Sequence, residues 1–244
     1  MADGGIALAI MCKAPVAGES KTRLCPPLSR EQAAELSRCF IADVADTVGA
    51  VARDAGGRGY AVITPAGAEG AFAGLLPEGV RILTQRGADL SARLTHATRD
   101  LLADGHTGVC LINADGPTLP AELLARAVAV LREPGEAIAL VPAIDGGYAL
   151  IGLKREHPSL FADVAWSTSR VLAQTLVRAG GLGVPVSLLP SWYDVDDVAG
   201  LELLGCELSG AGGFVLEGQG LKGAAAPRTR AFLAALPAGG TTGP

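Results

Sequence analysis

Short apolar runs alternate with longer amphipathic stretches along most of the chain. Residues 6–11 (IALAIM) form a nearly continuous apolar run, which is typical of a strand buried on both faces. A polar loop containing proline and glycine follows, up to about residue 28. Similar runs predict six further strands, at residues 60–64, 80–84, 109–113, 137–141, 148–153 and 184–189.

The segments between these runs have helical spacing. Ser29 and Gln32 form a capping-box pattern that opens a long amphipathic helix ending near Arg53. The remaining helices are predicted at residues 69–76, 89–103, 120–132, 168–179 and 198–204. Regular alternation of strand and helix predicts an α/β fold with three layers, in which a mostly parallel, mixed sheet carries helices on both faces.

The alternating pattern extends over most of the chain as one unit. Residues 1–208 are predicted to form one domain. Residues 209–244 are richer in Gly, Ala and Pro, and we expect a C-terminal extension that packs on the same domain or trails from it. Its last residues, 237–244, are expected to be frayed.

Composition narrows the class of protein. Of 244 residues, 49% are hydrophobic and 18% charged, so a sizeable core is expected. The net charge of −5 disfavours nucleic acid as a partner. No apolar stretch reaches the ~18–20 residues needed to span a membrane, and no signal peptide is evident. We therefore expect a cytoplasmic protein with no membrane partner.

The cysteines and histidines give no motif of known chemistry. The five cysteines include no C-x-x-C pair, and we expect buried free thiols. The three histidines are expected to be surface or packing residues. The sequence contains no H-E-x-x-H, G-x-S-x-G or G-x-G-x-x-G, so zinc hydrolysis, serine hydrolysis and dinucleotide binding are poorly supported.

Ligands of open α/β sheets bind at the carboxyl ends of the strands, so the loops there are inspected first. The loop after the first strand contains Lys13, Gly18, Lys21, Thr22 and Arg23. Cations beside a close-approach glycine suit a polyphosphate. A Walker A loop fails because a serine, not a glycine, precedes the lysine. The alternative is a solvated basic loop.

Aspartates at two other strand ends are candidate magnesium ligands. Asp115 follows the fourth strand in an Asp-Gly-Pro turn, and Mg²⁺ prefers one or two carboxylates with water and phosphate oxygens. Asp194 and Asp196 alternate, so in an extended segment their side chains point the same way. The alternatives are a helix-initiating turn at Asp115, and N-capping of the next helix by Asp196 or Asp197.

Two further segments lie beside these loops in the predicted sheet. Asp145, Gly146, Gly147 and Tyr148 either form only a hairpin turn or also let a ligand approach bare backbone. In the run Trp166-Ser167-Thr168, either hydroxyl residue could cap the helix predicted at 168–179. The free N–H groups there would bind an anion, or the cap would serve the helix alone.

The order of these motifs resembles the radical-SAM/selenodomain-associated transferase family, which is grouped with glycosyltransferase-A-fold proteins of the nucleotide-diphospho-sugar transferase superfamily. The resemblance covers roughly residues 6–205. It includes a further run, Gln85-x-Gly87-x-Asp89-Leu90-x-x-Arg93-Leu94. The N-terminal loop also resembles phospholactate guanylyltransferases. The chain departs from the first family's pattern at Ala114, where that family usually has Ser, and at Ser91, where it usually has Gly.

The resemblance implies a role for each motif. Lys13, Lys21 and Arg23 would contact nucleotide phosphates, with Gly18 and Thr22 in the same loop, and Gln85, Gly87 and Asp89 would lie near the base or ribose. Asp115 with Asp194 or Asp196 would hold Mg²⁺, with Mn²⁺ as an alternative. The segments at Asp145–Tyr148 and Trp166–Thr168 would face a small-molecule acceptor.

Three functions remain open at this point. The leading hypothesis is nucleotidyl transfer from a nucleoside triphosphate to a small acceptor bearing a phosphate or similar anion, with Lys21, Arg23 and Asp115 as catalytic residues. The nearest alternative is glycosyl transfer from a nucleotide-sugar, with Asp145 as a base toward the acceptor. The third is a nucleotide-binding module without catalysis.

Overall fold

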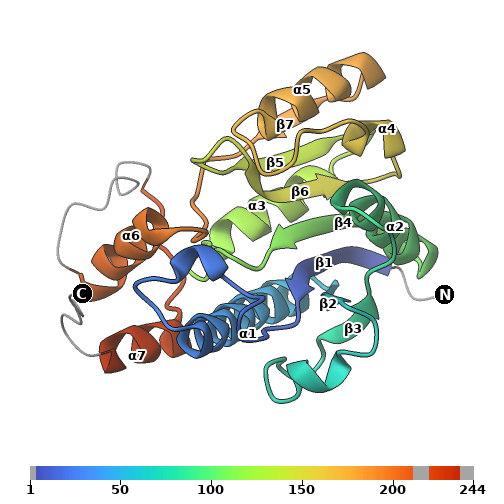
Figure 1. Cartoon of the computed structure of the whole chain (residues 1–244). Coiled ribbons are helices and arrows are strands. Elements are labelled where there is room, and N and C mark those ends of the chain that lie inside the picture. Colours follow the sequence, from blue (N-terminus) through green and yellow to red (C-terminus); the bar gives the residue numbers. More distant parts are fainter. Residues whose placement is uncertain (1–3, 211–219, 237–244) are drawn as a thin grey trace.

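The computed structural model describes residues 4–210 and 220–236, and seven of the described segments form one sheet (Figure 1). The strand order is β3-β2-β1-β4-β6-β5-β7. All neighbouring strands are parallel except β6, which is antiparallel to both β4 and β5. The sheet is therefore mixed and mostly parallel, as predicted. The strands are β1 (Gly4–Lys13), β2 (Arg58–Thr64), β3 (Arg81–Thr84), β4 (His106–Asn113), β5 (Ile138–Pro142), β6 (Tyr148–Leu153) and β7 (Val186–Leu188).

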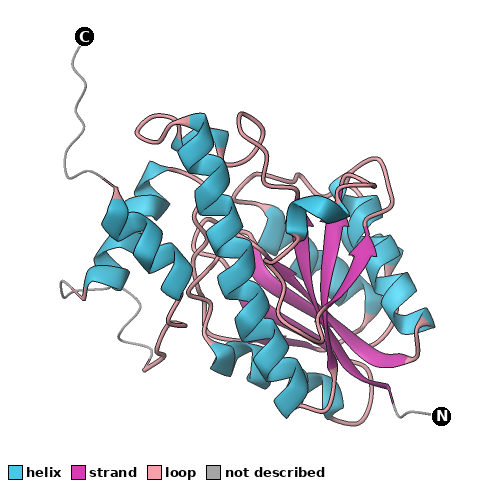
Figure 2. Cartoon of the chain, turned by 90° about the horizontal axis from the view of Figure 1, so that it is seen from below, coloured by secondary structure: helices cyan, strands magenta, loops and turns pink. Residues whose placement is uncertain are grey.

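Helices cover both faces of the sheet and complete three layers (Figure 2). One face is covered by α1 (Arg30–Asp54) and α3 (Ala121–Arg132). Side chains of α6 (Val198–Ser209) and α7 (Pro227–Ala235) join the same core. The other face is covered by α2 (Leu90–Ala103), α4 (Pro158–Phe161) and α5 (Val171–Leu182). Two short 3₁₀ turns complete the described elements, η1 (Thr22–Leu24) and η2 (Glu69–Phe72).

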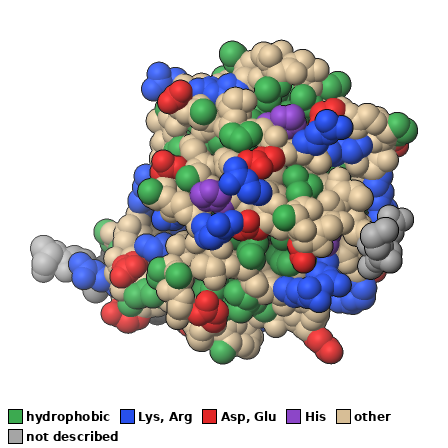
Figure 3. All heavy atoms as spheres, turned by 90° about the vertical axis from the view of Figure 1, so that its right-hand side faces the viewer, with side chains coloured by type: hydrophobic (Ala, Val, Ile, Leu, Met, Phe, Trp, Pro, Cys, Tyr) green, Lys and Arg blue, Asp and Glu red, His purple; other side chains and the backbone are tan. Residues whose placement is uncertain are grey.

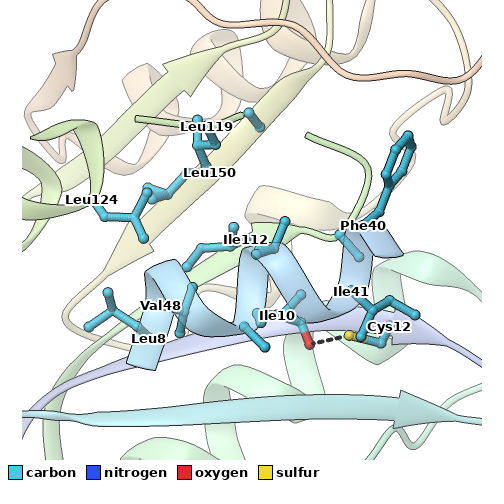
Figure 4. Packing of buried hydrophobic residues seen from close by; sticks show 14 of the residues in the cluster. Leu8, Ile10, Cys12, Phe40, Ile41, Val48, Ile112, Leu119, Leu124 and Leu150 are labelled. Carbon is cyan, nitrogen blue, oxygen red and sulfur yellow. Dashed lines mark hydrogen bonds between the residues drawn. The ribbon is translucent and has the colours of Figure 1, made fainter. Parts of the chain in front are cut away.

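The core explains why β1 reads as an unbroken apolar run. Leu8 and Ile10 point to the side of α1 and α3, where they lie in one cluster with residues such as Val48 and Ile112 (Figure 4). Ala7 and Ala9, on the alternate positions, face the core beneath α2. Because successive strand residues point to opposite faces and both faces are buried, every position of the strand centre is apolar.

Two predicted helix starts are confirmed by their hydrogen bonds. The Ser29 hydroxyl accepts from the backbone N–H of Gln32 at 3.1 Å, and the Gln32 side chain accepts from the Ser29 N–H at 2.8 Å. Of the two aspartates considered for the cap of α6, Asp197 takes this role, since its carboxylate accepts from the N–H of Gly200 at 2.9 Å. Residues 69–76 were expected to be a helix, but only the 3₁₀ turn η2 forms.

The helix predicted at 168–179 is displaced toward the C-terminus. Helix α5 begins at Val171 with Arg170 as its N-cap, so neither Ser167 nor Thr168 caps it, and the prediction was wrong on this point. Ser167 has a φ of 60°, in the left-handed region that a right-handed helix excludes. The Thr168 hydroxyl instead donates to the Ala165 carbonyl at 2.6 Å, within the preceding loop.

A buried carboxylate joins the C-terminal extension to the domain. Asp43 of α1 accepts from the N–H of Thr229 at 2.8 Å and from the N–H of Arg228 at 3.2 Å. These donors lie in the first turn of α7, where backbone N–H groups have no partner within the helix. Helix α7 therefore packs on α1, whereas the expected fraying of residues 237–244 concerns residues outside the described part.

Charged side chains of both signs share the face of the molecule drawn in Figure 3, where Lys and Arg side chains mix with Asp and Glu side chains. No described helix is long and apolar enough to cross a membrane.

The five cysteines are free, as expected. Cys12, Cys39 and Cys110 are buried, but Cys25 is only half-buried and Cys206 is exposed.

Candidate functional site

The loops singled out in the sequence meet at one edge of the sheet. Strands β1, β4 and β5 are parallel, so their carboxyl ends lie at the same edge. The segment after β7 then crosses that edge from β5 to β4. The N–H of Trp192 donates to the Pro142 carbonyl at 2.9 Å, and the N–H of Val195 donates to the Asp115 carbonyl at 2.9 Å.

A buried aromatic pair anchors this crossing segment. Trp192 and Tyr193 are fully buried and stacked, with ring centroids 5.8 Å apart. Thr118, just beyond Asp115, accepts from the Trp192 indole at 3.3 Å and donates to the Tyr193 hydroxyl at 3.2 Å. Tyr193 in turn donates to Glu207 of α6. The backbone on which Asp194 and Asp196 lie is therefore held by side-chain packing.

Lys21 lies at the centre of the site. Its Nζ is 2.7 Å from Asp115 Oδ1 and 2.9 Å from Asp196 Oδ1, and it donates to the Val195 carbonyl at 2.7 Å. The Phe40 ring lies 5.7 Å from the ammonium, within range of a cation–π contact. The Lys21 side chain is only 7% exposed. One cation therefore joins the ends of β1 and β4 to the crossing segment.

Burial and charge oppose each other at this ion cluster. Burial by itself would lower the pKa of Lys21, but the Asp115 and Asp196 carboxylates outweigh it and hold the pKa above its ordinary value. Burial raises the pKa of Asp115, and the neighbouring Asp196 adds to that rise while Lys21 opposes it. The lysine is thus firmly charged, and the carboxylates around it depend on that charge.

Asp194, on the crossing segment, also has a strongly perturbed environment. Burial, followed by repulsion from Asp196, Asp145 and Asp115, raises its pKa to about 7, against a smaller opposing effect of Lys21. Its Oδ2 lies 3.4 Å from the Asn113 amide nitrogen. None of the described ion pairs includes Asp194. Such a carboxylate is a position where an added cation would be strongly stabilised.

Two adjacent cavities open beside the cluster. The first, the basic cavity, has a volume of about 370 Å³ and lies against the loop after β1. It has both cations and carboxylates in its wall, and Lys13 reaches it from a 3.5 Å ion pair with Glu19. The predicted site residues that line it are Lys13, Lys21, Thr22, Arg23, Asp115, Ser167 and Asp196.

The second, the acidic cavity, has a volume of about 200 Å³ and lies under the loop before α5. Its floor is apolar, with Leu94, Leu111 and Ile151, and no Lys, Arg or His is among its described lining residues. The predicted site residues that line it are Asp145, Gly147, Tyr148, Trp166, Ser167, Thr168, Asp194 and Asp196. Ser167 and Asp196 belong to both walls, so the cavities are neighbours.

Five predicted site residues line neither cavity, and most of them have a visible structural use. Gln85 donates to the carbonyls of Cys12 at 3.0 Å and Val62 at 2.7 Å. Asp89 caps α2 by accepting from the Ala92 N–H at 2.8 Å. Gly87 has a φ of 124°, and a Cβ there would lie 2.6 Å from the Ala92 Cβ. Gly18 and Gly146 also have positive φ.

Sequence reasoning missed residues whose chemistry is unremarkable in isolation. Ser20 is buried, donates to the Ala14 carbonyl at 3.1 Å and accepts from the Val16 N–H at 3.0 Å, which folds the loop around Lys21. Asn113 lines the acidic cavity beside Asp194. Its place at the end of β4, two residues before Asp115, was a usable signal.

The carboxylates at this edge offer a partial set of metal ligands. Among the described residues, no group of three or more His, Cys, Asp or Glu is arranged to hold a metal ion. Asp115 and Asp196 are already paired with Lys21, whereas Asp194 is not. Magnesium usually takes only one or two carboxylates and completes its shell with water and substrate phosphate. These oxygen donors, in a region of concentrated negative charge, fit an ion bound together with a phosphate chain.

Half of the chain, from the middle of α1 to the loop before α5, matches a known protein family. Residues 47–168 match a protein family described as "Uncharacterized protein conserved in bacteria (DUF2064)". The chain belongs to the DUF2064 family. A search among curated proteins returned no match.

One solved structure is similar to this DUF2064 member over most of both chains. A protein from Desulfovibrio desulfuricans G20, assigned as a nucleotide-diphospho-sugar transferase, is 30% identical, with 82% of this chain and 86% of that chain covered and a TM-score of 0.73.

Two more distant structures match in fold alone. One is CMP:2-keto-3-deoxy-manno-octonic acid synthetase complexed with CTP, at 11% identity, 85% and 100% coverage, and a TM-score of 0.53. The other is 4-diphosphocytidyl-2C-methyl-D-erythritol synthase from Anaerococcus prevotii DSM 20548, at 9% identity, 85% and 99% coverage, and a TM-score of 0.55. The predicted glycosyltransferase-A-like fold is confirmed by these matches.

Proposed function

We propose that this chain is a metal-dependent transferase that uses an activated nucleotide, and that it transfers a nucleotidyl group from a nucleoside triphosphate to a small acceptor. The observation that carries the proposal is the basic cavity, where Lys13, Lys21 and Arg23 converge beside three carboxylates. A triphosphate needs more cationic contact than a diphospho-sugar. The likeness in fold to synthases that use cytidine nucleotides, and the resemblance of the N-terminal loop to phospholactate guanylyltransferases, support the same direction.

The residues of the basic cavity would act mainly through charge and position. An oxyanion of the acceptor attacks the α-phosphorus, the bond between that phosphorus and the α,β-bridging oxygen breaks, and pyrophosphate leaves. Lys13 and Arg23, both accessible from solvent, neutralise the charge that develops on the leaving group. Lys21 has its Nζ within 3 Å of two carboxylates and keeps its charge in the cavity wall.

The carboxylates would hold a divalent cation. Asp194 with Asp115 or Asp196 supplies the protein ligands, and the resemblance of the motifs points to Mg²⁺, with Mn²⁺ as an alternative. When bound, such an ion polarises phosphoryl oxygens and offsets negative charge. Asn113 keeps the Asp194 carboxylate in place through the amide contact at 3.4 Å.

The charge of the acidic cavity limits which part of the acceptor would bind there. Three carboxylates and no described cation line it, so a phosphate placed deep within it would be repelled. We therefore place the attacking anion of the acceptor near Ser167, where the two cavities adjoin, and its uncharged remainder against Tyr148 and Trp166. The displaced start of α5 leaves Ser167 without the helix-cap role expected of it, so anion binding there would rest on Lys21 and the cation.

Glycosyl transfer from a nucleotide-sugar is the second candidate. The 30%-identical protein is assigned as a nucleotide-diphospho-sugar transferase, and an acidic cavity with aromatic walls also suits a sugar. Asp145 would then be the base toward the acceptor hydroxyl. It is exposed, and its Oδ1 accepts from the Gly147 N–H at 2.8 Å, which fixes its orientation.

Thermal unfolding with the four nucleoside triphosphates and common nucleotide-sugars, each with and without Mg²⁺, tests both candidates. A ligand that binds only the folded state adds about 2.7 kcal/mol at 100 times its Kd. Pyrophosphate release is then measured with 2-phospholactate and sugar 1-phosphates as acceptors. Release from one triphosphate supports nucleotidyl transfer, whereas turnover of a nucleotide-sugar without any pyrophosphate release would overturn it.

A matched pair of variants connects the assay to the site. Asp115→Asn is expected to reduce turnover more than tenfold, a loss above ~1.4 kcal/mol of transition-state stabilisation. Asp54→Asn is the control, because Asp54 is exposed at the end of α1. If Asp115→Asn keeps turnover within tenfold of the wild type, the role given to Asp115 is wrong.

A further inference from the structure

The loop that carries Trp166 into the acidic cavity is not held by regular secondary structure. It runs from the end of α4 to the start of α5, and two of its residues, Asp163 and Ser167, have positive φ values of 51° and 60°. Such conformations cost a non-glycine residue free energy and persist only where other contacts impose them. The position of the indole must therefore be set by contacts outside the loop's own backbone.

Ser91 supplies one of those contacts from another element. It is the second residue of α2, and its hydroxyl accepts from the Trp166 Nε1–H at 2.8 Å. The same hydroxyl donates to the carbonyl of Phe161 at 2.6 Å, and Phe161 is the last residue of α4. A serine hydroxyl has one proton to donate, so this arrangement leaves its lone pairs free for the indole.

The indole fixed in this way is part of the cavity wall. Trp166 and Tyr148 meet edge to face, with ring centroids 6.3 Å apart and planes at 78°. Both line the acidic cavity with Asp194. With its N–H directed to Ser91, the indole has one preferred orientation in the wall. Without that acceptor, both the indole N–H and the Phe161 carbonyl would lose a partner.

We propose that Ser91 is a positioning residue, whose hydroxyl holds the Trp166 indole as a fixed wall of the acidic cavity and thereby sets the shape available to the acceptor. The consequence for the acceptor rests on the function proposed above, but the positioning itself does not. Ser91 lines neither cavity and acts through Trp166. The loss of its hydroxyl is therefore expected to affect acceptor binding and to leave binding of the triphosphate in the basic cavity unchanged.

Nuclear magnetic resonance of the indole N–H groups tests the positioning without any ligand. The chain has two tryptophans, so a ¹⁵N-labelled protein gives two indole signals. A Trp166→Phe variant assigns them, and Trp192, bonded to Thr118, is the internal reference. In Ser91→Ala, the Trp166 signal should shift, and its N–H should exchange with solvent about five- to tenfold faster, the change expected for one lost hydrogen bond.

Two further variants separate positioning from general destabilisation. Ser91→Thr keeps a hydroxyl and should restore the wild-type signal. Thr95→Ala removes a neighbouring hydroxyl of the same helix, which donates to the Ser91 carbonyl at 2.8 Å, and should leave the Trp166 signal unchanged. An unaltered Trp166 signal and exchange rate in Ser91→Ala would overturn the proposal, as would an equal change in Thr95→Ala.

The kinetic part of the experiment addresses the acceptor. In the pyrophosphate-release assay, Ser91→Ala should raise KM for the acceptor several-fold while KM for the triphosphate stays within twofold of the wild type. Equal KM values for the acceptor in Ser91→Ala and wild type would contradict the proposal that Ser91 sets the shape of the cavity available to the acceptor. If no triphosphate is turned over by the wild type, the proposed function fails, whereas the indole measurement still decides whether Ser91 positions Trp166.

Discussion

At the residue scale, the site is organised by one lysine shared between carboxylates that are distant in sequence. Lys21 contacts Asp196, 175 positions further along the chain, and Asp115 lies between them in sequence. Removal of either carboxylate leaves a buried cation with less compensation, and removal of the lysine leaves two carboxylates that repel each other. Function and folding therefore compete at these residues, and exposed neighbours such as Arg23 are the cleaner probes of nucleotide binding.

The raised pKa of Asp194 predicts how stability depends on pH. Its folded-state pKa is about 7 and its ordinary value 3.8, so the folded protein holds this proton more tightly than the unfolded chain. The associated stabilisation is complete below pH ~4 and is lost as the pH rises through 7. In EDTA, Asp194→Asn should be more stable than the wild type at pH 8, by about 1–2 kcal/mol after allowance for solvent screening.

Urea unfolding of wild type and Asp194→Asn at pH 5 and pH 8 measures this difference in stability, which should be smaller at pH 5 than at pH 8. Asp197→Asn is the matched control, because Asp197 is exposed and asparagine caps a helix as well as aspartate does. A difference between Asp194→Asn and the wild type that is independent of pH would contradict the assignment.

At the element scale, the ends of helices decide how distant segments join. Helix α5 begins where the N–H of Leu172 can donate to the Gly146 carbonyl at 2.9 Å, so its start is set by the hairpin turn between β5 and β6. A Cβ at Gly146 would lie 2.3 Å from the Ser169 carbonyl oxygen, which explains why this turn carries a glycine. Helix α7 begins in a comparable way, with its first N–H groups on Asp43 of α1.

Asp43 is therefore expected to matter far more than its neighbour Asp46. Asp43→Ala leaves the N–H groups of Arg228 and Thr229 without their acceptor and should lower the free energy of unfolding by about 2–3 kcal/mol. Asp46 has only an exposed ion pair with Arg228, so Asp46→Ala should cost less than about 1 kcal/mol. Urea unfolding measures both, and similar losses for the two variants would refute the cap role of Asp43.

At the scale of the whole molecule, the cavities at the carboxyl edge and the contact between α1 and α7 use different residues. The carboxyl edge carries both cavities, and the ion cluster there joins two strand ends to the crossing segment. Helix α7 packs on α1, where Asp43 accepts from the backbone N–H groups of its first turn. A ligand in the basic cavity should therefore slow hydrogen exchange of backbone amides at the carboxyl edge of the sheet. It should leave exchange at the α1–α7 contact unchanged.

Hydrogen exchange measured with and without a bound triphosphate and Mg²⁺ examines this separation. Backbone amides in residues 13–24, 113–118 and 192–197 should exchange more slowly with ligand, because the ligand is expected to bridge these three segments. Amides of α7 should exchange at an unchanged rate. Protection spread evenly over the chain, or confined to α7, would argue against binding at the carboxyl edge.

Much of the architecture follows from local pattern. The apolar runs predicted all seven strands, because a strand buried on both faces admits few polar residues whatever its neighbours are. The capping box at Ser29 predicted the start of α1 from two residues whose hydrogen bonds are local. The candidate loops were found because strand ends are where open α/β sheets place ligands, and most of the predicted residues line one of the two cavities.

The tertiary structure decided the contacts between segments that are far apart in the chain. No local pattern directs Lys21 to Asp115 and Asp196, or Ser91 to Trp166, because the partners meet only once the sheet order is set. The same reason explains the displaced start of α5 and the structural bonds of Gln85 and Asp89. The sequence by itself determined which groups are available at the site, and packing over long sequence separations determined which of them face each other.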